Sequence, residues 1–508
     1  MKVIKLKFIL VFILLYSNNI EAKTIEINNS IKDITNILNN APENSVIKIK
    51  NGNYEASGVK IEKNNITILG ESLNGVNIKL YANEKNGVFF RVGKRGPETD
   101  YRPDNLPVYN GTLNSWSEKD FSPSTLDYPR YSNIHISNIT FVLSDKNGKG
   151  VGSGIEYYRV NESSLNATVK WEKYFDFGNA VRFHYCKNLK LPFLRIESNP
   201  KVTFGMLYYW SYGLNGGDLN FGNANLVSAE FKHSVNSYIS NLVTFGDGRS
   251  NYRGVNIGYG SINNKFDNLI INNGMLNLKS SVEFDLSRDI DIKRLKIINN
   301  KGAGLSISRI EKLNIENYSI SAESPIILTT MKYYVGNNKT GKLLKKDTLF
   351  SNTGDYLGSD SENNYNKFYD YRPFPILKNA NFKQGNIFVT SKANYGVLAN
   401  ISKEANHMFK NYKNSNKFNN KDIRKFGYKE NFRNTYSFNN SLAFSMENIN
   451  FGNMIITNKS NNSLKAFVYL GVPVINSKGN IKLYGKGKEV ISYRLDNSDI
   501  KFNKESIQ

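Results

Sequence analysis

Between residues 227 and 318 the chain repeats one short pattern, and no other feature constrains its fold as strongly. The equivalent residues Asn241, Asn268, Arg294 and Asn317 are spaced by 27, 26 and 23 residues. Within each copy, apolar and polar residues alternate with a period of two, which is typical of strands and not of helices. Units of this length bury their apolar faces by stacking on one another. The repeat therefore predicts an all-β solenoid, a parallel β-helix.

Asparagine is abundant in this chain, and a β-helix has a specific use for it at the corners of its coils. Asn tolerates a left-handed backbone better than most residues. Its side-chain amide can also bond to an equivalent amide one coil away. The composition therefore predicts ladders of stacked asparagines at the corners.

The first 22 residues have the pattern of a secretory signal peptide. Three lysines precede a short apolar run at residues 8–16, and Ala22 supplies a small residue at the cleavage position. The apolar run is too short to span a bilayer comfortably. We therefore expect residues 1–22 to be a signal peptide. The protein would then be exported to the periplasm, the cell surface or the medium, with no membrane span.

The residues that follow predict how the solenoid begins. Ser30 and Asp33 resemble a capping box, and an amphipathic helical pattern runs from there to Pro42. Such a helix would cover the apolar end of the first coil. Strand-like residues 46–49 and 66–70 come next. This order resembles the opening of the pectate-lyase-like right-handed parallel β-helix superfamily, over about residues 24 to 320. The resemblance implies a right-handed β-helix with an N-terminal capping helix, and says little about chemistry.

Two segments interrupt the repeat and are expected to be inserted loops. Residues 93–130 are rich in proline, and residues 198–222 carry an aromatic cluster that includes Trp210. Exposed aromatic rings there would suit stacking on sugars, or equally would cover the flank of the solenoid. We assign residues 23–330 to the β-helix. Residues 331–508, where the repeat fades, fit either irregular C-terminal coils with insertions or a small appended β-domain.

The chain carries a formal net charge of +23, which favours a polyanionic partner. Export and the absence of a recognition motif argue against nucleic acid. An acidic polysaccharide is therefore the expected partner. Alternatively, the excess of lysine reflects only a genome biased toward Asn, Lys and Ile codons.

Stacking of the repeats would gather charged residues on the outer face of one sheet. Side chains alternate along a strand, so the neighbours of an inward hydrophobic residue point outward. Aligning the coils on Phe183, Phe231, Ile257, Phe284 and Ile307 gives two outward columns. The columns are Arg182, Glu230, Asn256, Glu283 and Ser306, and His184, Lys232, Gly258, Asp285 and Ser308. The alternative to a functional patch is an ordinary salt-bridged surface.

This patch suits β-elimination from a uronate polymer. The C5 carboxylate must be neutralised by cations or by a hard metal ion, and a base then removes the C5 proton. We assign catalysis to Lys232, Arg253 and His233, substrate binding to Arg182, Trp210, Arg249, Asn256 and Tyr259, and calcium binding to Glu230, Glu283 and Asp285.

Residues 225–234, followed one coil later by residues 255–260, resemble the chondroitinase B and alginate lyase family. That family has a Lys-Ser pair in one coil and an Arg-His-Gly triplet in the next. The resemblance implies that Lys232 is the base. The triplet would fall on residues 258–260, which read Gly-Tyr-Gly, so the family's arginine is missing and Arg253 would have to replace it.

Two other classes of function remain open. A β-helix glycoside hydrolase would use two carboxylates, Glu283 with Asp285 or with Glu230. A non-catalytic β-helix would bind a glycan or a cell surface, as an adhesin does. The missing arginine favours the second of these, whereas the clustered outward charges favour the lyase.

Overall fold

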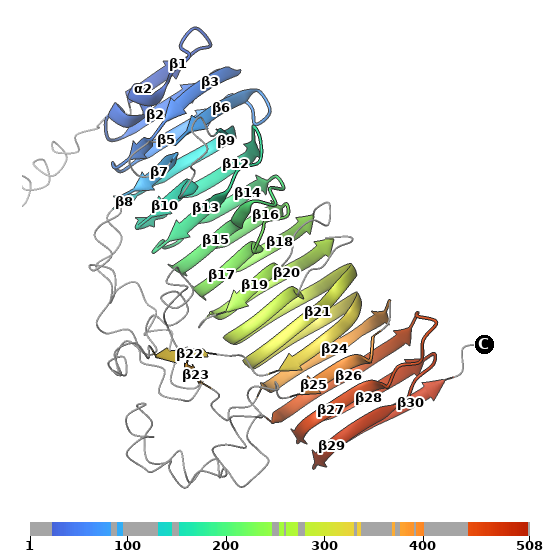
Figure 1. The fold of residues 1–508 in the computed structure, drawn as a ribbon. Coiled ribbons are helices and arrows are strands. Elements are labelled where there is room, and N and C mark those ends of the chain that lie inside the picture. Colours follow the sequence, from blue (N-terminus) through green and yellow to red (C-terminus); the bar gives the residue numbers. More distant parts are fainter. Residues whose placement is uncertain are drawn as a thin grey trace, which may run out of the picture.

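The computed structural model shows a chain built almost entirely of β-strands. It describes residues 23–82, 89–94, 131–144, 152–245, 253–258, 261–272, 280–329, 333–336, 368–370, 376–390, 393–400 and 445–505. Figure 1 shows coil after coil stacked along one axis, from β1 at the N-terminal end to β30 at the other.

Strands one coil apart pair with one another and form two long ladders. Ladder A contains β1 (Lys23–Ile27), β2 (Ser45–Ile49), β5 (Ile66–Gly70), β9 (Ile134–Ser144), β12 (Ser164–Trp171), β14 (Lys190–Ile196), β16 (Asn215–Phe221), β18 (Tyr238–Phe245), β20 (Ile262–Asn272), β21 (Ser280–Thr329), β24 (Leu377–Val389), β26 (Met446–Asn458), β28 (Lys478–Tyr484) and β30 (Asp499–Glu505). Ladder B contains β4 (Val59–Ile61), β7 (Phe90–Gly93), β10 (Ser153–Tyr158), β13 (Phe177–His184), β15 (Val202–Tyr212), β17 (Val227–Val235), β19 (Arg253–Gly258), both ends of β21, β25 (Tyr395–Asn400), β27 (Ala466–Ile475) and β29 (Val490–Asp496). All these pairings are parallel, so the parallel β-helix predicted from the repeat is confirmed.

The remaining strands complete the coils. A third ladder starts with β3 (Gly52–Ser57) and β6 (Val76–Tyr81) and continues in the second half of β9. A short parallel pair joins β8 (Tyr131–Ser132) to β11 (Val160–Asn161), and an antiparallel pair joins β22 (Tyr333–Gly336) to β23 (Phe368–Asp370). The strands from β24 to β30 extend ladders A and B, and are therefore further coils of the same solenoid.

One predicted loop is in fact a coil. Residues 198–222 were expected to interrupt the repeat, but they form β15 and β16 and pair with the coils before and after them. Tyr208 of the aromatic cluster is fully buried and lies in register between Phe183 and Phe231. Its ring fills the core. The prediction that the aromatic cluster belongs to a loop is therefore wrong for Tyr208. Of the other predicted loop, residues 95–130 lie outside the described residues.

The core is a column of large side chains that stack from coil to coil. Phe183 lies 5.4 Å from Tyr157 and 6.2 Å from Tyr208, measured between ring centroids, and Tyr208 lies 6.2 Å from Phe231. Aromatic pairs at these separations are favourable beyond the area that they bury. Because every coil contributes to this column at the same height of its strand, the column fixes the register of ladder B.

The N-terminal end of the core is covered by α2 (Thr35–Asn40), which buries Leu38 against the first coil. The capping box predicted at Ser30 is wrong. The Ser30 hydroxyl donates to the Asn28 side chain, and the helix begins later, where the Thr35 amide donates to Asp33 Oδ1 at 2.8 Å. Among the described residues no helix is long and apolar enough to cross a bilayer.

A left-handed residue recurs in every coil, at the corner where ladder B leads into ladder A. The φ angles lie between +46° and +72° at Asn44, Asn65, Asn133, Glu162, Asn188, Gly213, Asn236, Asn263, Asp289, Lys312, Asn379, Asn448, Asn476 and Asn497. The strand register aligns these residues from coil to coil. Most are asparagine because this residue accepts a positive φ at low cost.

The amides of this corner form the predicted ladders. Asn65 donates to Asn44 at 2.8 Å, and Asn133 donates to Asn65 at 3.0 Å. Farther along, Asn263 donates to Asn236 at 2.6 Å. These bonds run parallel to the solenoid axis and satisfy polar groups where strand pairing stops.

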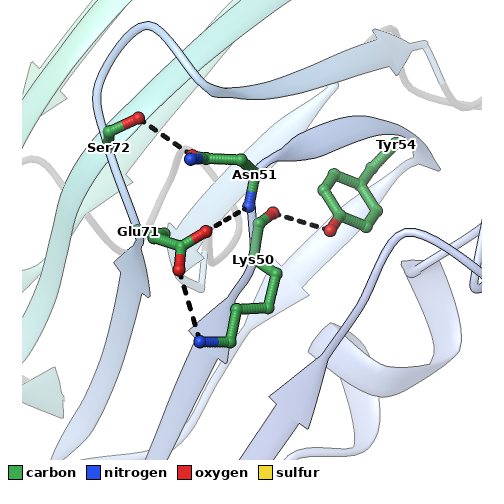
Figure 2. A network of polar contacts seen from close by, with 5 residues as sticks. All are labelled: Lys50, Asn51, Tyr54, Glu71 and Ser72. Carbon is green, nitrogen blue, oxygen red and sulfur yellow. Dashed lines mark hydrogen bonds and ion pairs between the residues drawn. The ribbon is translucent and has the colours of Figure 1, made fainter.

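A different corner of the first coils is held by the network in Figure 2. Glu71 accepts from the Asn51 backbone amide at 2.9 Å and from the Lys50 ammonium at 3.3 Å. These two bonds, the backbone one first, lower the pKa of Glu71. Ser72 donates to the Asn51 side chain, and Tyr54 donates to the Lys50 carbonyl. The network ties the turn after β2 to the turn after β5.

We predict that Asn236→Ala lowers the free energy of unfolding by about 1–2 kcal/mol, because alanine pays for a positive φ and loses the amide bonds to Tyr212 and Asn263. Asn236→Gly loses the same bonds but adopts the backbone freely, so it should cost less. Urea unfolding of the three proteins measures the difference. Equal losses in both variants would show that the left-handed backbone is not the constraint.

We also predict that Cys186 is inert in the folded protein. Burial raises the pKa of its thiol to about 12, so almost no reactive thiolate exists near neutral pH. A thiol reagent at pH 8 should label Cys186 only after unfolding in denaturant. Labelling of the native protein at the rate of a free thiol would contradict the buried position.

Candidate functional site

The outer face of ladder B carries a row of side chains on seven successive strands, and six of these side chains are polar. In register along β7, β10, β13, β15, β17, β19 and β21, the row reads Arg91, Glu156, Arg182, Leu207, Glu230, Asn256 and Glu283. Most of these residues are buried, although charged residues normally lie at the surface. A buried charged row on an outer face is the strongest indication of a functional site in the described structure.

The predicted columns are confirmed in part. Glu230, Asn256 and Glu283 are direct neighbours on successive strands, as expected. Arg182, however, does not adjoin Glu230, because β15 lies between them and places Leu207 in the row. The extra coil at residues 202–221 thus divides the row into two clusters.

The first cluster, which we call the β17–β21 cluster, contains Glu230, Lys232, Arg253, Asn256 and Glu283. The Lys232 ammonium lies 3.3 Å from Glu230 Oε1, and Asn256 donates to the same oxygen at 3.2 Å. Arg253 forms an ion pair with Glu283. The side chain of Glu230 is only 2% exposed, and those of Arg253 and Glu283 are 15% exposed. Two ion pairs therefore lie largely buried on neighbouring strands.

Burying the charges of this cluster costs folding free energy, so its presence calls for an explanation. Removing two charges from water costs several kcal/mol per ion, which their attraction offsets only in good geometry. In the other ion pairs of the described residues at least one side chain is more exposed, as in Arg91–Glu62, with side chains 9% and 32% exposed, and Lys50–Glu71, with side chains 55% and 43% exposed. The contrast between the exposed pairs and the two buried pairs marks the β17–β21 cluster as the candidate site.

The second cluster, which we call the β10–β15 cluster, contains Tyr158, Arg182, His184, Tyr185 and Tyr209. Arg182 Nη2 donates to His184 Nδ1 at 3.0 Å. The His184 ring stacks on Tyr185 and Tyr209, with centroids 4.1 Å and 4.5 Å away, and meets the edge of Tyr158 at 4.9 Å. The sequence pattern placed His184 on the outer face without a role and Tyr209 only in the aromatic cluster of residues 198–222, whereas Tyr158 and Tyr185 were not singled out. Aligning the coils through Tyr208 would have brought Tyr209 beside His184.

The other predicted site residues cannot be placed in either cluster. Arg249 and Tyr259 lie outside the described residues. Trp210, His233 and Asp285 lie on β15, β17 and β21, but their side chains are outside what the structure describes. The roles assigned to these five residues stay predictions.

The predicted calcium ligands were Glu230, Glu283 and Asp285. Within the described residues, no group of three His, Cys, Asp or Glu side chains is placed to hold a metal ion. Glu230 already accepts from Lys232, and Glu283 already pairs with Arg253. A calcium ion would have to displace these cations, so the two described carboxylates do not by themselves form its site.

No protein-family model and no curated protein matches the chain. Among solved structures, the A-module of the Azotobacter vinelandii mannuronan C-5 epimerase AlgE6 is 11% identical, covers 95% of this chain and 100% of its own length, and gives a TM-score of 0.30. The periplasmic alginate epimerase AlgG is 8% identical, with coverages of 96% and 85% and a TM-score of 0.33. The Yersinia enterocolitica family 28 exopolygalacturonase is 8% identical, with coverages of 96% and 79% and a TM-score of 0.23. At these TM-scores the likeness carries no argument about activity.

The buried pair of Lys232 and Glu230 makes a stability prediction. Glu230→Leu deprives a largely buried ammonium of its carboxylate and should cost about 3–5 kcal/mol. The double variant Glu230→Leu with Lys232→Met removes both charges and should recover most of that loss. Glu197→Leu, in the exposed pair with Lys170, is the control and should change little. Thermal and urea unfolding measure all three. A double variant no more stable than the single one would contradict a coupled buried pair.

Proposed function

We propose that this protein is exported and binds an acidic, uronate-containing polysaccharide along the outer face of ladder B. It cleaves the polymer by β-elimination at the β17–β21 cluster. The observation that carries the proposal is the pair of largely buried ion pairs, Lys232–Glu230 and Arg253–Glu283, on neighbouring strands. They place a candidate base on β17 and a candidate carboxylate binder on the adjacent strand β19. The net charge of +23 suits a polyanionic substrate, and export rests on the signal pattern of residues 1–22.

The chemistry assigns a role to each residue. Arg253 exchanges Glu283 for the substrate carboxylate, and neutralising that carboxylate acidifies the C5 proton. Lys232, once it has passed its own proton to Glu230 at 3.3 Å, removes the C5 proton. The C4–O4 bond then breaks, its electron pair leaves with O4, which takes up the proton that Lys232 removed from C5, and a C4=C5 double bond forms. Glu230 then returns its proton to Lys232. Asn256 holds Glu230 in place through its 3.2 Å hydrogen bond.

A hydrolase is less well supported by the same residues. Glu230 and Glu283 lie on strands two spacings apart, roughly 10 Å between backbones, whereas the carboxyl groups of an inverting pair lie roughly 6.5–9.5 Å apart. Hydrolysis needs one carboxylic acid in its protonated form. Because each carboxylate pairs with a cation, its charged form is favoured at rest, whereas the β-elimination needs Glu230 to hold a proton only during the step.

A non-catalytic glycan-binding protein is the second candidate. It is favoured by the completeness of the ion pairing, because every charge of the β17–β21 cluster already has an opposite partner. Such a cluster could bind a polyanion through Lys232 and Arg253 without any bond breaking.

We predict that the protein produces unsaturated uronate, seen as ultraviolet absorbance, from at least one of alginate, pectate, chondroitin, dermatan and hyaluronan. Lys232→Ala should lower the rate by about 10²–10⁴-fold, the usual contribution of a general base. Lys293→Ala, which removes an exposed lysine of ladder A, is the control and should keep full activity. Parallel assays with calcium and with chelator test the metal.

Two results would count against the lyase. Absorbance that rises equally with Lys232→Ala would remove the proposed base. No absorbance and no new reducing ends, with the polymer retained on the protein, would favour the binding protein.

A further inference from the structure

Arg182 differs from the other buried or half-buried cations described on the outer face of ladder B; Lys60, in register with Arg91, is exposed. Arg91, Lys232 and Arg253 each pair with a carboxylate, of Glu62, Glu230 and Glu283 respectively. Among the residues that the structure describes, Arg182 forms no ion pair, although it is in register with Glu156 on the adjacent strand. Its polar partner is a ring nitrogen, His184 Nδ1, and its own Nε has no hydrogen-bond partner. A partly buried positive charge without a negative partner costs free energy, and a bound anion would offset that cost.

The hydrogen-bond acceptor of Arg182 is held in place by an aromatic stack. Because a guanidinium can only donate, His184 Nδ1 accepts, and the neutral ring carries its proton on Nε2. The imidazole itself is fixed between Tyr185 and Tyr209. A guanidinium whose acceptor is fixed loses little freedom on binding, and because its Nε is buried a carboxylate would meet the terminal Nη atoms.

The distance between the two clusters suits a polymer. β13, which carries Arg182, and β17, which carries Lys232, are separated by β15, so they lie two strand spacings apart, roughly 10 Å. Between them lie Leu207 and Tyr209, both uncharged and 8% exposed. The β10–β15 cluster is therefore a separate anion position on the same face, displaced along the solenoid axis.

We propose that Arg182, positioned by His184, binds the carboxylate of a second uronate unit of the chain whose first unit lies at Lys232 and Arg253. This inference rests on the proposed function and narrows its substrate. The substrate would be a polymer with carboxylates on closely spaced units, lying along the solenoid axis, rather than one with isolated acidic units.

Binding to oligomers of increasing length tests the proposal. In the Lys232→Ala background, which prevents cleavage, titration calorimetry would use monouronates and size-fractionated oligomannuronates and oligogalacturonates of two to six units. Affinity should rise with length in the parent. Adding Arg182→Ala should weaken the hexamer about 10- to 100-fold and leave the monouronate unchanged. A carboxyl-reduced hexamer should bind neither protein.

Three further variants separate binding from folding. Arg195→Ala removes an exposed arginine of ladder A and should leave the hexamer affinity unchanged. Arg182→Lys keeps the charge without the fork, and His184→Phe keeps the stack without the acceptor. Both should weaken only the longer oligomers, a length dependence that a purely structural role would not produce. Thermal unfolding confirms that each variant is folded.

The outcomes distinguish the two claims. If the parent binds oligouronates and Arg182→Ala binds all lengths as tightly as the parent, the second carboxylate position is wrong and the proposed function stands. If the parent binds no oligouronate of any length, while the unmutated protein neither retains nor cleaves the polymers, the proposed function fails and this inference fails with it.

Discussion

The structure depends on one backbone constraint, the left-handed corner that every coil makes between ladder B and ladder A. A positive φ at this corner turns the chain sharply enough for the next strand to fall one coil above the previous one. Asparagine meets the constraint at low cost and adds amide bonds along the axis, as at Asn44, Asn65 and Asn133. Because the corner recurs at the same register, the outward residues of ladder B also recur at the same height. The candidate site follows from that alignment.

Alignment alone does not make a site, and burial and pairing distinguish two regions of the row. In the β17–β21 cluster, cations and carboxylates neutralise each other, with Glu230 accepting from both Lys232 and Asn256. In the β10–β15 cluster, Arg182 rests on a histidine instead. The first arrangement can exchange partners and move a proton, whereas the second offers a guanidinium that forms no ion pair within the described residues. A polymer that reaches both would be held at one cluster and processed at the other.

Much of the fold could be predicted from the sequence because the period of two and the repeat length are local signals. The asparagine corners were predictable for the same reason. The coil at residues 202–221 was not, because its inward position is occupied by Tyr208 beside other aromatics, and aromatic clusters look alike in a core and in a loop. Without this coil, the sequence pattern placed Arg182 directly beside Glu230 and did not bring Tyr209 next to His184. Pairing such as Arg253 with Glu283 depends on side-chain conformation across strands, which no pattern along the chain encodes.

The most direct test of the account is a crystal structure of the Lys232→Ala variant with a bound oligouronate. The account predicts sugar units along the solenoid axis over β13 to β19, with one carboxylate at Arg253 and another at Arg182. An oligomer bound on ladder A, or across the strands without contact to either arginine, would contradict it.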